Sequence, residues 1–155
     1  MGIKPRPRSG ISWSAMRKIL EQENICDSLK GRVQYFQTRY PKAHDHHGRI
    51  AVRLDKKEIF KAHYFDTAHN PDIRNGHWYD ASFYGAFYEY QNNNIDKSLE
   101  SSDPLIRLFA IMDRRVGKRR LEKLQQEVEK QPEWLQIFYK LRLEARGFLA
   151  DKPIE

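Results

Sequence analysis

The spacing of apolar residues changes near the middle of this chain of 155 residues. In RIAVRLD, residues 49–55, large apolar side chains occupy every second position, at Ile50, Val52 and Leu54. A period of two residues is typical of a half-buried β-strand. From about residue 78 onward, apolar residues recur every three or four positions, which is the period of a helix with one buried face. Strands followed by helices predict an α+β fold.

Three β-type segments predict a small sheet. RVQYFQTRY (32–40) and EIFKAHYFD (58–66) are rich in aromatic and β-branched residues and flank the strand at 49–55. HDHHG (44–48) and DKK (55–57) are turn sequences. Short turns between consecutive strands predict a three-stranded antiparallel meander, whose apolar face needs a cover.

We expect one α+β domain over residues 12–150, beginning with a helix in SWSAMRKILEQ that Ser12 or Ser14 caps. The other predicted boundaries are a flexible basic arm at 1–11, a sheet at 32–66, a helical part at 78–149 and a tail at 151–155. The arm is predicted from its prolines and exposed basic residues.

The helical part should form a C-terminal cluster of three to four helices. WYDASFYGAFYEYQ (78–91) carries an aromatic stripe, and Asp103 before Pro104 is a strong start signal for a helix that we expect to reach about Arg115. Helical spacing continues in LEKLQQEVEK, and Pro132 opens the last helix. The predicted buried face of that last helix consists of Trp134, Phe138, Leu141, Ala145 and Phe148.

The charge is distributed unevenly around a net value of +7. Residues 1–65 carry a net +8 (14 Lys and Arg, 6 Asp and Glu), and residues 66–103 carry −5 (2 against 7). Residues 104–120 carry +5 (6 against 1), and 121–155 carry −1 (6 against 7). Two basic sections therefore flank an acidic one, which favours binding of a polyanion.

The stretch DRRVGKRRL (113–121) gathers five cations around Gly117: Arg114, Arg115, Lys118, Arg119 and Arg120. Either these cations form ion pairs with carboxylates and lock a helix–helix corner, or they bind an anion such as phosphate. The two interpretations are compatible, since a corner has an inside and an outside. We expect Asp113 and Arg120 on the inside and Lys118 and Arg119 on the outside.

A second basic group lies in the predicted sheet and consists of Arg49, Arg53 and Lys61. With these cations, Tyr35, Tyr40 and Arg39 could stack and hold single-stranded bases, although such aromatics also join a sheet to its covering helices. Another aromatic group could line a groove for a protein partner or a second copy of the chain, and consists of Tyr84, Tyr88 and Tyr90.

All six histidines fall between His44 and His77. Histidine is a common ligand of transition metals, so His44, His46, His47 and His69 are weak candidates for metal binding. No zinc-ligand spacing or HExxH motif is present, and solvent-exposed histidines without a ligand role fit the pattern better. His63 could act as a general base with Glu58 or Asp66, but no nucleophile stands at a recognisable spacing.

The chain contains no recognisable catalytic motif, such as a P-loop or a GxSxG elbow. We therefore favour a non-enzymatic role and expect no cofactor, although the absence of a motif does not by itself exclude catalysis. The single cysteine, Cys26, fits a reducing compartment. No apolar run suits a membrane span or a signal peptide, so we expect a cytoplasmic protein without a membrane partner.

Two segments carry a resemblance. SSDPLIRLFAIMDRRVGKRRL, which continues to PEWLQIFYKLRLEARG, and SWSAMRK near the start resemble a family of small bacterial proteins of unassigned function. The resemblance covers Trp13 to Gly147 and implies a bacterial origin and one domain, but it brings no catalytic residue. Three hypotheses follow: a polyanion-binding protein whose partner is nucleic acid, a protein–protein adaptor or homodimer, and a histidine-dependent metalloenzyme such as a nuclease.

Overall fold

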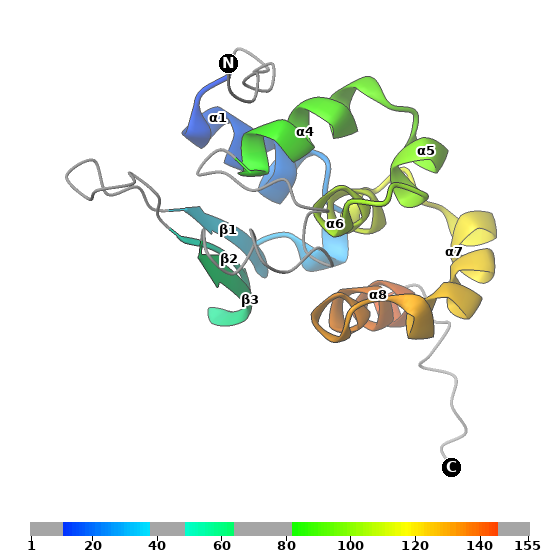
Figure 1. Ribbon diagram of the computed structural model, residues 1–155. Helices are drawn as coiled ribbons and strands as arrows, with labels where there is room; N and C mark the ends of the chain where they lie inside the picture. Colours follow the sequence, from blue (N-terminus) through cyan, green and yellow to red (C-terminus); the bar gives the residue numbers. More distant parts are fainter. Residues whose placement is uncertain (1–10, 38–48, 64–81, 146–155) are drawn as a thin grey trace.

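The computed structural model describes residues 11–37, 49–63 and 82–145 (Figure 1). The α+β fold is confirmed, with an N-terminal helix, a three-stranded antiparallel sheet and then several helices. The first elements are α1 (Trp13–Lys18), η1 (Ile19–Glu23), η2 (Asp27–Leu29), β1 (Val33–Gln37), β2 (Arg49–Leu54) and β3 (Lys57–His63). The later ones are α4 (Ser82–Asn92), α5 (Ile95–Leu99), α6 (Pro104–Met112), α7 (Lys118–Leu124), η3 (Gln125–Lys130) and α8 (Glu133–Ala145). None of the described helices is long and apolar enough to cross a membrane.

The sheet has the order β1–β2–β3, and both neighbouring pairs are antiparallel. Val52 at its centre pairs with Tyr35 of β1 and with Phe60 of β3, and all three side chains are buried. The predicted meander therefore presents an apolar face to the helices. The predicted arm, apart from Ile11, and the predicted tail lie outside the described residues.

The turn between β2 and β3 holds two residues in the left-handed region, Asp55 with φ 51° and Lys56 with φ 72°. Arg32 anchors the first of them, because its Nε and Nη2 each donate a hydrogen bond of 2.9 Å to the Asp55 carboxylate. This contact holds the pKa of Asp55 below its usual value. Lys56 is exposed and carries the strain of a conformation that favours glycine.

Replacing Lys56 by glycine should therefore raise the free energy of unfolding by about 0.5 kcal/mol. Relief of the left-handed strain contributes roughly 1–2 kcal/mol, and the larger conformational freedom of glycine in the unfolded chain offsets part of it. Urea unfolding of K56G measures the change. Lys57→Gly is the control, since glycine inside β3 should destabilise the protein. A loss of stability in K56G would contradict the strained turn.

The N-terminal helix begins after Ser12, whose hydroxyl accepts a hydrogen bond of 3.1 Å from the backbone N–H of Ala15. Its last part widens into the π-helical turn η1, which brings Glu21 inward. Glu21 accepts the backbone N–H of Tyr35 at 2.8 Å and the Nε of Arg17 at 2.7 Å. A buried carboxylate thus joins the N-terminal helix to strand β1.

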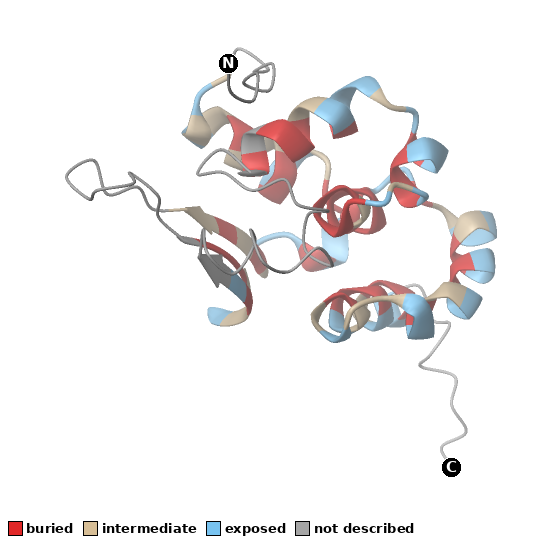
Figure 2. Cartoon of the chain, viewed as in Figure 1, coloured by how far each residue is buried: buried red, intermediate tan, exposed pale blue. Residues whose placement is uncertain are grey.

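The core centres on α6, whose side chains are buried on all sides except at Arg107 (Figure 2). Asp103 caps this helix as predicted and accepts the N–H of Leu105 at 2.9 Å. Aromatic rings connect the sheet to the helices, since Tyr35 makes edge contacts with Phe83 of α4 and Phe109 of α6 at centroid distances of 5.6 and 5.4 Å. The sheet and the helices therefore share one hydrophobic core.

The buried face of α8 differs in part from the predicted one. Phe138 is buried as expected, but Trp134 and Leu141 are only half-buried and Ala145 is exposed. The residues that are buried on α8 are Leu135, Phe138, Tyr139, Arg142 and Leu143. The stripe is rotated by about one position, which turns Arg142 inward in place of Leu141. Phe148 lies outside the described residues.

Candidate anion-binding site

A tight corner joins α6 to α7. Helix α6 ends at Met112 and not at about Arg115, because Asp113 leaves the helical conformation (φ −69°, ψ 133°). Backbone hydrogen bonds hold the corner against the N-terminal segment: the N–H of Cys26 donates to the carbonyl of Met112 at 2.9 Å, and the N–H of Arg114 to that of Asn24 at 2.7 Å. Arg114 and Arg115 therefore lie in a turn and not in the last turn of a helix.

The helix break lies at Asp113, and Gly117 is the N-cap residue of α7. It is extended (φ −95°, ψ −169°) and directly precedes Lys118, the first residue of α7. A Cβ atom built at this glycine would meet nothing within 4 Å. Gly117 is therefore required neither by its backbone conformation nor by packing, and it leaves open space beside the basic side chains.

Asp113 is the centre of a hydrogen-bond network inside the corner and is 1% exposed, as expected from the sequence. The Nε and Nη2 of Arg115 donate to its two carboxylate oxygens at 3.0 and 2.7 Å, and the backbone N–H of Arg115 donates at 2.8 Å. The Tyr90 hydroxyl donates a short hydrogen bond to the same carboxylate and accepts one of 3.0 Å from Asn24 Nδ2. The network joins the N-terminal segment, α4 and the corner.

Burial and the neighbouring hydrogen bonds shift the pKa of Asp113 in opposite directions. Burial is the largest influence on Asp113 and disfavours its ionised form, yet the hydrogen bonds from Arg115 and Tyr90 hold its pKa below the usual value. Burial and the negative charge of Asp113 raise the pKa of Tyr90 far above its usual value. At neutral pH the network therefore consists of a carboxylate, a guanidinium and a neutral phenol.

A second arginine, Arg142 of α8, stabilises the corner through hydrogen bonds to its backbone. Arg142 of α8 is 2% exposed, and its Nε donates to the carbonyl of Ile111 at 2.9 Å. Its Nη2 donates to the carbonyls of Asp113 and Val116 at 3.2 and 2.8 Å. These bonds satisfy the carbonyl of Ile111 in the last turn of α6, which has no later helical turn to donate to it, and two carbonyls of the corner itself. A buried cation at a helix C-terminus is also favoured by the helix dipole.

The remaining cations of the corner face solvent. Arg114, Lys118 and Arg119 are exposed, and no carboxylate of the described residues pairs with them. Arg120 does not lie inside as predicted. Its side chain is 39% exposed, and its Nε donates at 2.6 Å to Asp96 in the first turn of α5.

Lys118, Arg119 and Arg120 line a hollow of about 410 Å³, which we call the cationic hollow. Its lining residues are Asp96, Arg115, Gly117, Lys118, Arg119, Arg120 and Lys123. Five of them are cationic and one is acidic. The Arg120 guanidinium holds the pKa of Asp96 below its usual value, so the single carboxylate stays ionised. A positive excess remains at the surface of the hollow.

Two further hollows adjoin this one. Arg115 also lines a smaller hollow of about 330 Å³, together with Asn24, Tyr90, Gln91, Asp113 and Arg114. Asp96, Arg120 and Lys123 also line a groove of about 840 Å³ that extends along α5 and η3. The shared residues make the three depressions neighbours, with the cationic hollow between the other two.

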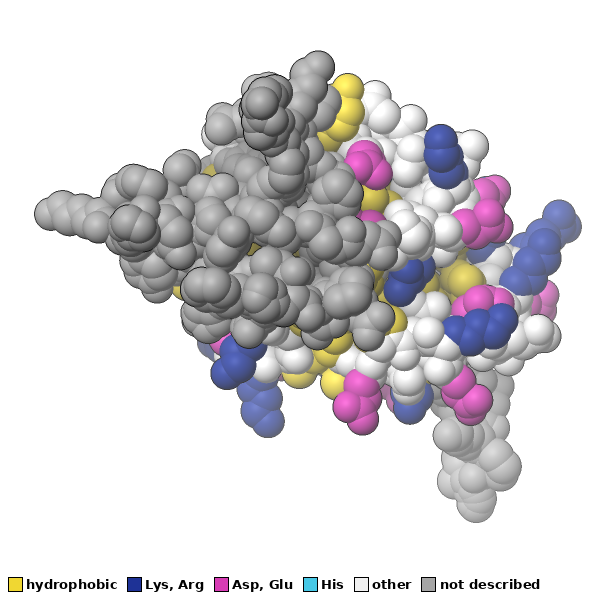
Figure 3. Space-filling view, in the orientation of Figure 1, with side chains coloured by type: hydrophobic (Ala, Val, Ile, Leu, Met, Phe, Trp, Pro, Cys, Tyr) yellow, Lys and Arg dark blue, Asp and Glu magenta, His cyan; other side chains and the backbone are white. Residues whose placement is uncertain are grey.

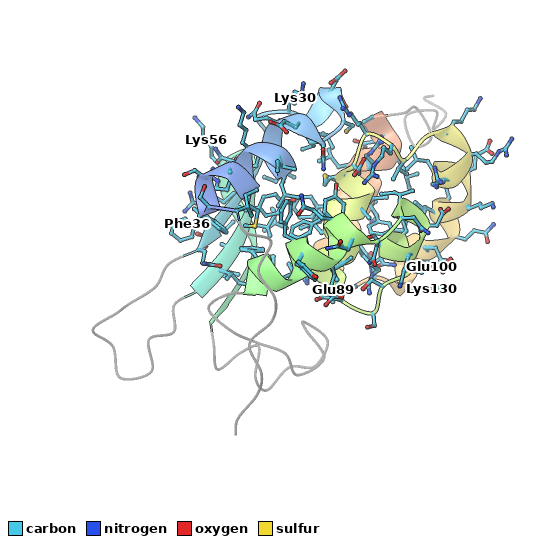
Figure 4. All side chains as sticks on the ribbon, turned by 90° about the horizontal axis from the view of Figure 1, so that it is seen from above. Lys30, Phe36, Lys56, Glu89, Glu100 and Lys130 are labelled. Carbon is cyan, nitrogen blue, oxygen red and sulfur yellow. The ribbon has the colours of Figure 1, made fainter. Side chains whose placement is uncertain are left out.

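The basic residues of the sheet form a separate surface. The sheet and α7 lie at opposite ends of the molecule in Figures 1 and 4. The Arg53 guanidinium lies 4.4 Å from the ring centroid of Phe36 and pairs with Glu58 at 3.5 Å, whereas Lys61 is exposed. The Arg49 side chain lies outside the described residues. The structure therefore does not join the sheet cations to the corner.

The predicted base-stacking face is wrong for Tyr35, which is 2% exposed because its ring fills the core between α4 and α6. Tyr90, predicted to line a partner groove, is also 2% exposed because its hydroxyl turns inward to Asp113. Tyr88 is half-buried on α4. The other aromatic and basic residues of these predictions, Arg39, Tyr40 and the side chain of Tyr84, lie outside the described residues.

The metal hypothesis stays a prediction. His44, His46, His47 and His69 lie outside the described residues, and so does the side chain of His63. Within residues 11–37, 49–63 and 82–145, no group of three or more His, Cys, Asp or Glu side chains could hold a metal ion. That result does not cover the histidines, because their side chains lie outside the described residues.

Three residues of the candidate site were not predicted. Asp96 lies 24 positions before its partner Arg120, and nothing in the sequence pairs the two. Lys123 belongs to a helix whose predicted role was only apolar packing. Arg142 had a recognisable signal, since it follows Phe138 by four positions and thus lies on the apolar stripe of α8.

The described face of the molecule in Figure 3 carries both signs of charge. On the described part of the face in Figure 3, Lys and Arg side chains are interleaved with Asp and Glu and form no continuous positive band. Because this face has no extended basic surface, the local positive excess in the cationic hollow is the feature that could attract an anion.

The family comparison matches most of the chain. The model of the SF0329 protein family matches residues 12–75 and 64–143. The chain belongs to the SF0329 protein family. This membership agrees with the family resemblance expected from the sequence, whereas a bacterial origin stays an expectation. No curated protein and no solved structure matches this member of the SF0329 protein family.

Proposed function

We propose that this member of the SF0329 protein family binds the phosphate groups of a nucleic acid through the cationic hollow. One observation carries the proposal: five Lys and Arg side chains and one carboxylate line a hollow of about 410 Å³. Like charges gathered at one place repel each other, and an entering phosphate would relieve that repulsion. Phosphate contacts of this kind supply most of the affinity of proteins for nucleic acids.

The arginines of the hollow are oriented in advance. Asp113 binds Nε and Nη2 of Arg115, and Asp96 binds the same two nitrogens of Arg120. In each guanidinium, Nη1 takes no part in these bonds to the carboxylate. Donors that are fixed before the ligand arrives lose little side-chain entropy on binding. The carboxylates therefore support anion binding here, although they reduce the net charge.

The neighbouring hollows favour an extended anion over a single small one. Arg114 and Arg115 line the small hollow on one side of the cationic hollow, and Lys123 and Arg120 line the groove on the other. A chain of phosphates can contact these positions in succession, whereas one inorganic phosphate can occupy only one of them. Nucleic acid is the polyanion that this row of contacts suits best.

The adaptor hypothesis has less support. Among the described residues, Ile137 is the exposed large hydrophobic side chain, at 42% exposure. It lies on α8 beside Ile59 and Trp134 in a shallow hollow. One exposed side chain makes a smaller apolar patch than interaction sites of monomeric proteins commonly show.

Titration of fluorescently labelled single-stranded RNA and DNA at about 50 mM salt tests the proposal. The double variant K118A/R119A should weaken binding roughly tenfold or more, because two phosphate contacts are lost. The fold should persist, since removing cations from the first turn of α7 relieves an unfavourable interaction with the helix dipole.

The matched control is K18A/K140A, which removes two exposed cations from α1 and α8 that line none of the three hollows. Its affinity should stay within about twofold of the wild type. Absence of binding by the wild type, or an equal loss in the control, would contradict the proposal.

A further inference from the structure

The groove beside the cationic hollow has a different chemistry from the hollow itself. It measures about 840 Å³, within the range of small-molecule sites. Beyond the wall shared with the hollow, its lining contains two apolar side chains, Leu99 and Leu124, and two carboxylates, Glu100 and Glu127. The charge therefore changes along the surface, from strongly positive in the hollow to mixed in the groove.

One arginine of the groove presents a fixed flat surface. The Nε of Arg107 donates to Gln131 Oε1 at 2.9 Å, and its Nη1 donates to the carbonyl of Ser101 at 2.8 Å. A guanidinium held in this way can stack on a planar ring such as a nucleobase. Leu99 and Leu124, each 9% exposed, add apolar surface beside it.

The two carboxylates of the groove are available as acceptors. Glu100 is exposed, and no ion pair of the described residues involves it. Among the described residues, the ion-pair partner of Glu127 is Lys130, at 3.4 Å and on the surface. Glu100 and Lys130 lie on the same side of the molecule in Figure 4 and both line the groove. Carboxylates are the groups that commonly accept hydrogen bonds from ribose hydroxyls.

From this arrangement we infer that the groove binds the nucleoside of a ribonucleotide whose phosphate occupies the cationic hollow. The shared wall of Asp96, Arg120 and Lys123 places the two parts of such a ligand next to each other. The negative head meets the cations, the hydroxyl-bearing sugar meets the carboxylates, and the base meets Arg107 and the two leucines. The inference rests on the proposed function and specifies its ligand as a ribonucleotide, free or at the end of an RNA strand.

Isothermal titration of the full chain with AMP, inorganic phosphate, adenosine and deoxy-AMP tests this inference. AMP should bind roughly tenfold tighter than phosphate or adenosine, because it alone fills both depressions. Deoxy-AMP should bind roughly fivefold more weakly than AMP, because one hydroxyl contact is lost. AMP binding no tighter than phosphate would overturn the inference.

The double variant E100Q/E127Q should weaken AMP binding roughly fivefold and leave phosphate binding unchanged, because the ribose loses charged acceptors. The control is E122Q/E129Q, which changes two exposed carboxylates that do not line the groove and should leave both affinities unchanged. Equal AMP affinity in the two double variants would overturn the role of the groove.

Two further comparisons separate the ligand sources and the two proposals. If RNA with a terminal phosphate binds more tightly than the same strand without it, the strand end is the ligand. If AMP binds and RNA does not, the ligand is the free nucleotide and the proposed nucleic-acid binding is overturned. RNA binding that K118A/R119A abolishes, without preference for AMP over phosphate, would overturn the groove and retain the proposed function. Absence of binding by RNA, DNA, AMP and phosphate alike would overturn both.

Discussion

Replacing Arg142 by methionine should lower the free energy of unfolding by about 3 kcal/mol. The guanidinium is buried and donates to the carbonyls of Ile111, Asp113 and Val116. Methionine fills a similar space but leaves these carbonyls without a donor where water cannot readily replace it. The loss should therefore exceed what the change in side-chain volume alone would cause.

Urea unfolding of R142M measures this loss, and two further variants show its cause. Arg142→Lys should have an intermediate effect, because one ammonium group cannot match a planar fork that bonds three carbonyls. Lys140→Met on the exposed side of α8 should change stability by no more than about 0.5 kcal/mol. A change below about 1 kcal/mol in R142M would show that the corner does not depend on this arginine.

Replacing Asp113 by asparagine should cost about 2 kcal/mol at neutral pH. The amide cannot accept the two guanidinium bonds of Arg115 and the Tyr90 hydroxyl as an ionised carboxylate does. The value is below that of a fully buried ion pair, since the Arg115 side chain is 55% exposed and solvent screens it.

The cost of this substitution should depend on pH in one direction. The pKa of Asp113 in the folded protein is below its usual value, so its contribution to stability is fully present above the unfolded pKa of about 4. The contribution is lost as the pH falls through the folded pKa. The stability difference between wild type and D113N should thus be constant from about pH 5 to 8 and shrink below about pH 4.

Unfolding of both proteins across this pH range provides the test, with Asp96→Asn as the comparison. Asp96 also has a lowered pKa, but its pair with Arg120 lies on the surface, where ion pairs contribute little. D96N should therefore be closer to the wild type than D113N at every pH. A difference for D113N that grows as the pH falls would contradict the carboxylate network.

The sequence predicted the elements whose signals are local. The proline after Asp103 correctly placed the start of α6, and the alternation in 49–55 correctly placed β2. The end of α6 could not be predicted, because it depends on backbone hydrogen bonds between the corner and Asn24–Cys26, nearly ninety positions earlier in the chain. Contacts between residues so far apart in the chain produce no periodic pattern in a single sequence.

In the candidate site, too, the sequence predicted local features and missed those that depend on contacts between distant segments. Lys118 and Arg119 face solvent and Asp113 is buried, all as expected. The position of Arg120 was wrong, because its partner Asp96 comes from α5, and only the fold brings α5 and α7 together. Arg142 could have been found, since a cation on the apolar stripe of a helix needs buried acceptors.

The salt dependence of RNA binding tests most directly whether the cationic hollow contacts phosphates. For the wild type, the logarithm of the association constant should fall linearly with the logarithm of the salt concentration between about 50 and 200 mM. For K118A/R119A the slope should be shallower by about 1.4, or roughly 0.7 for each lost phosphate contact on a single strand. Equal slopes for the two proteins would contradict phosphate binding in the cationic hollow.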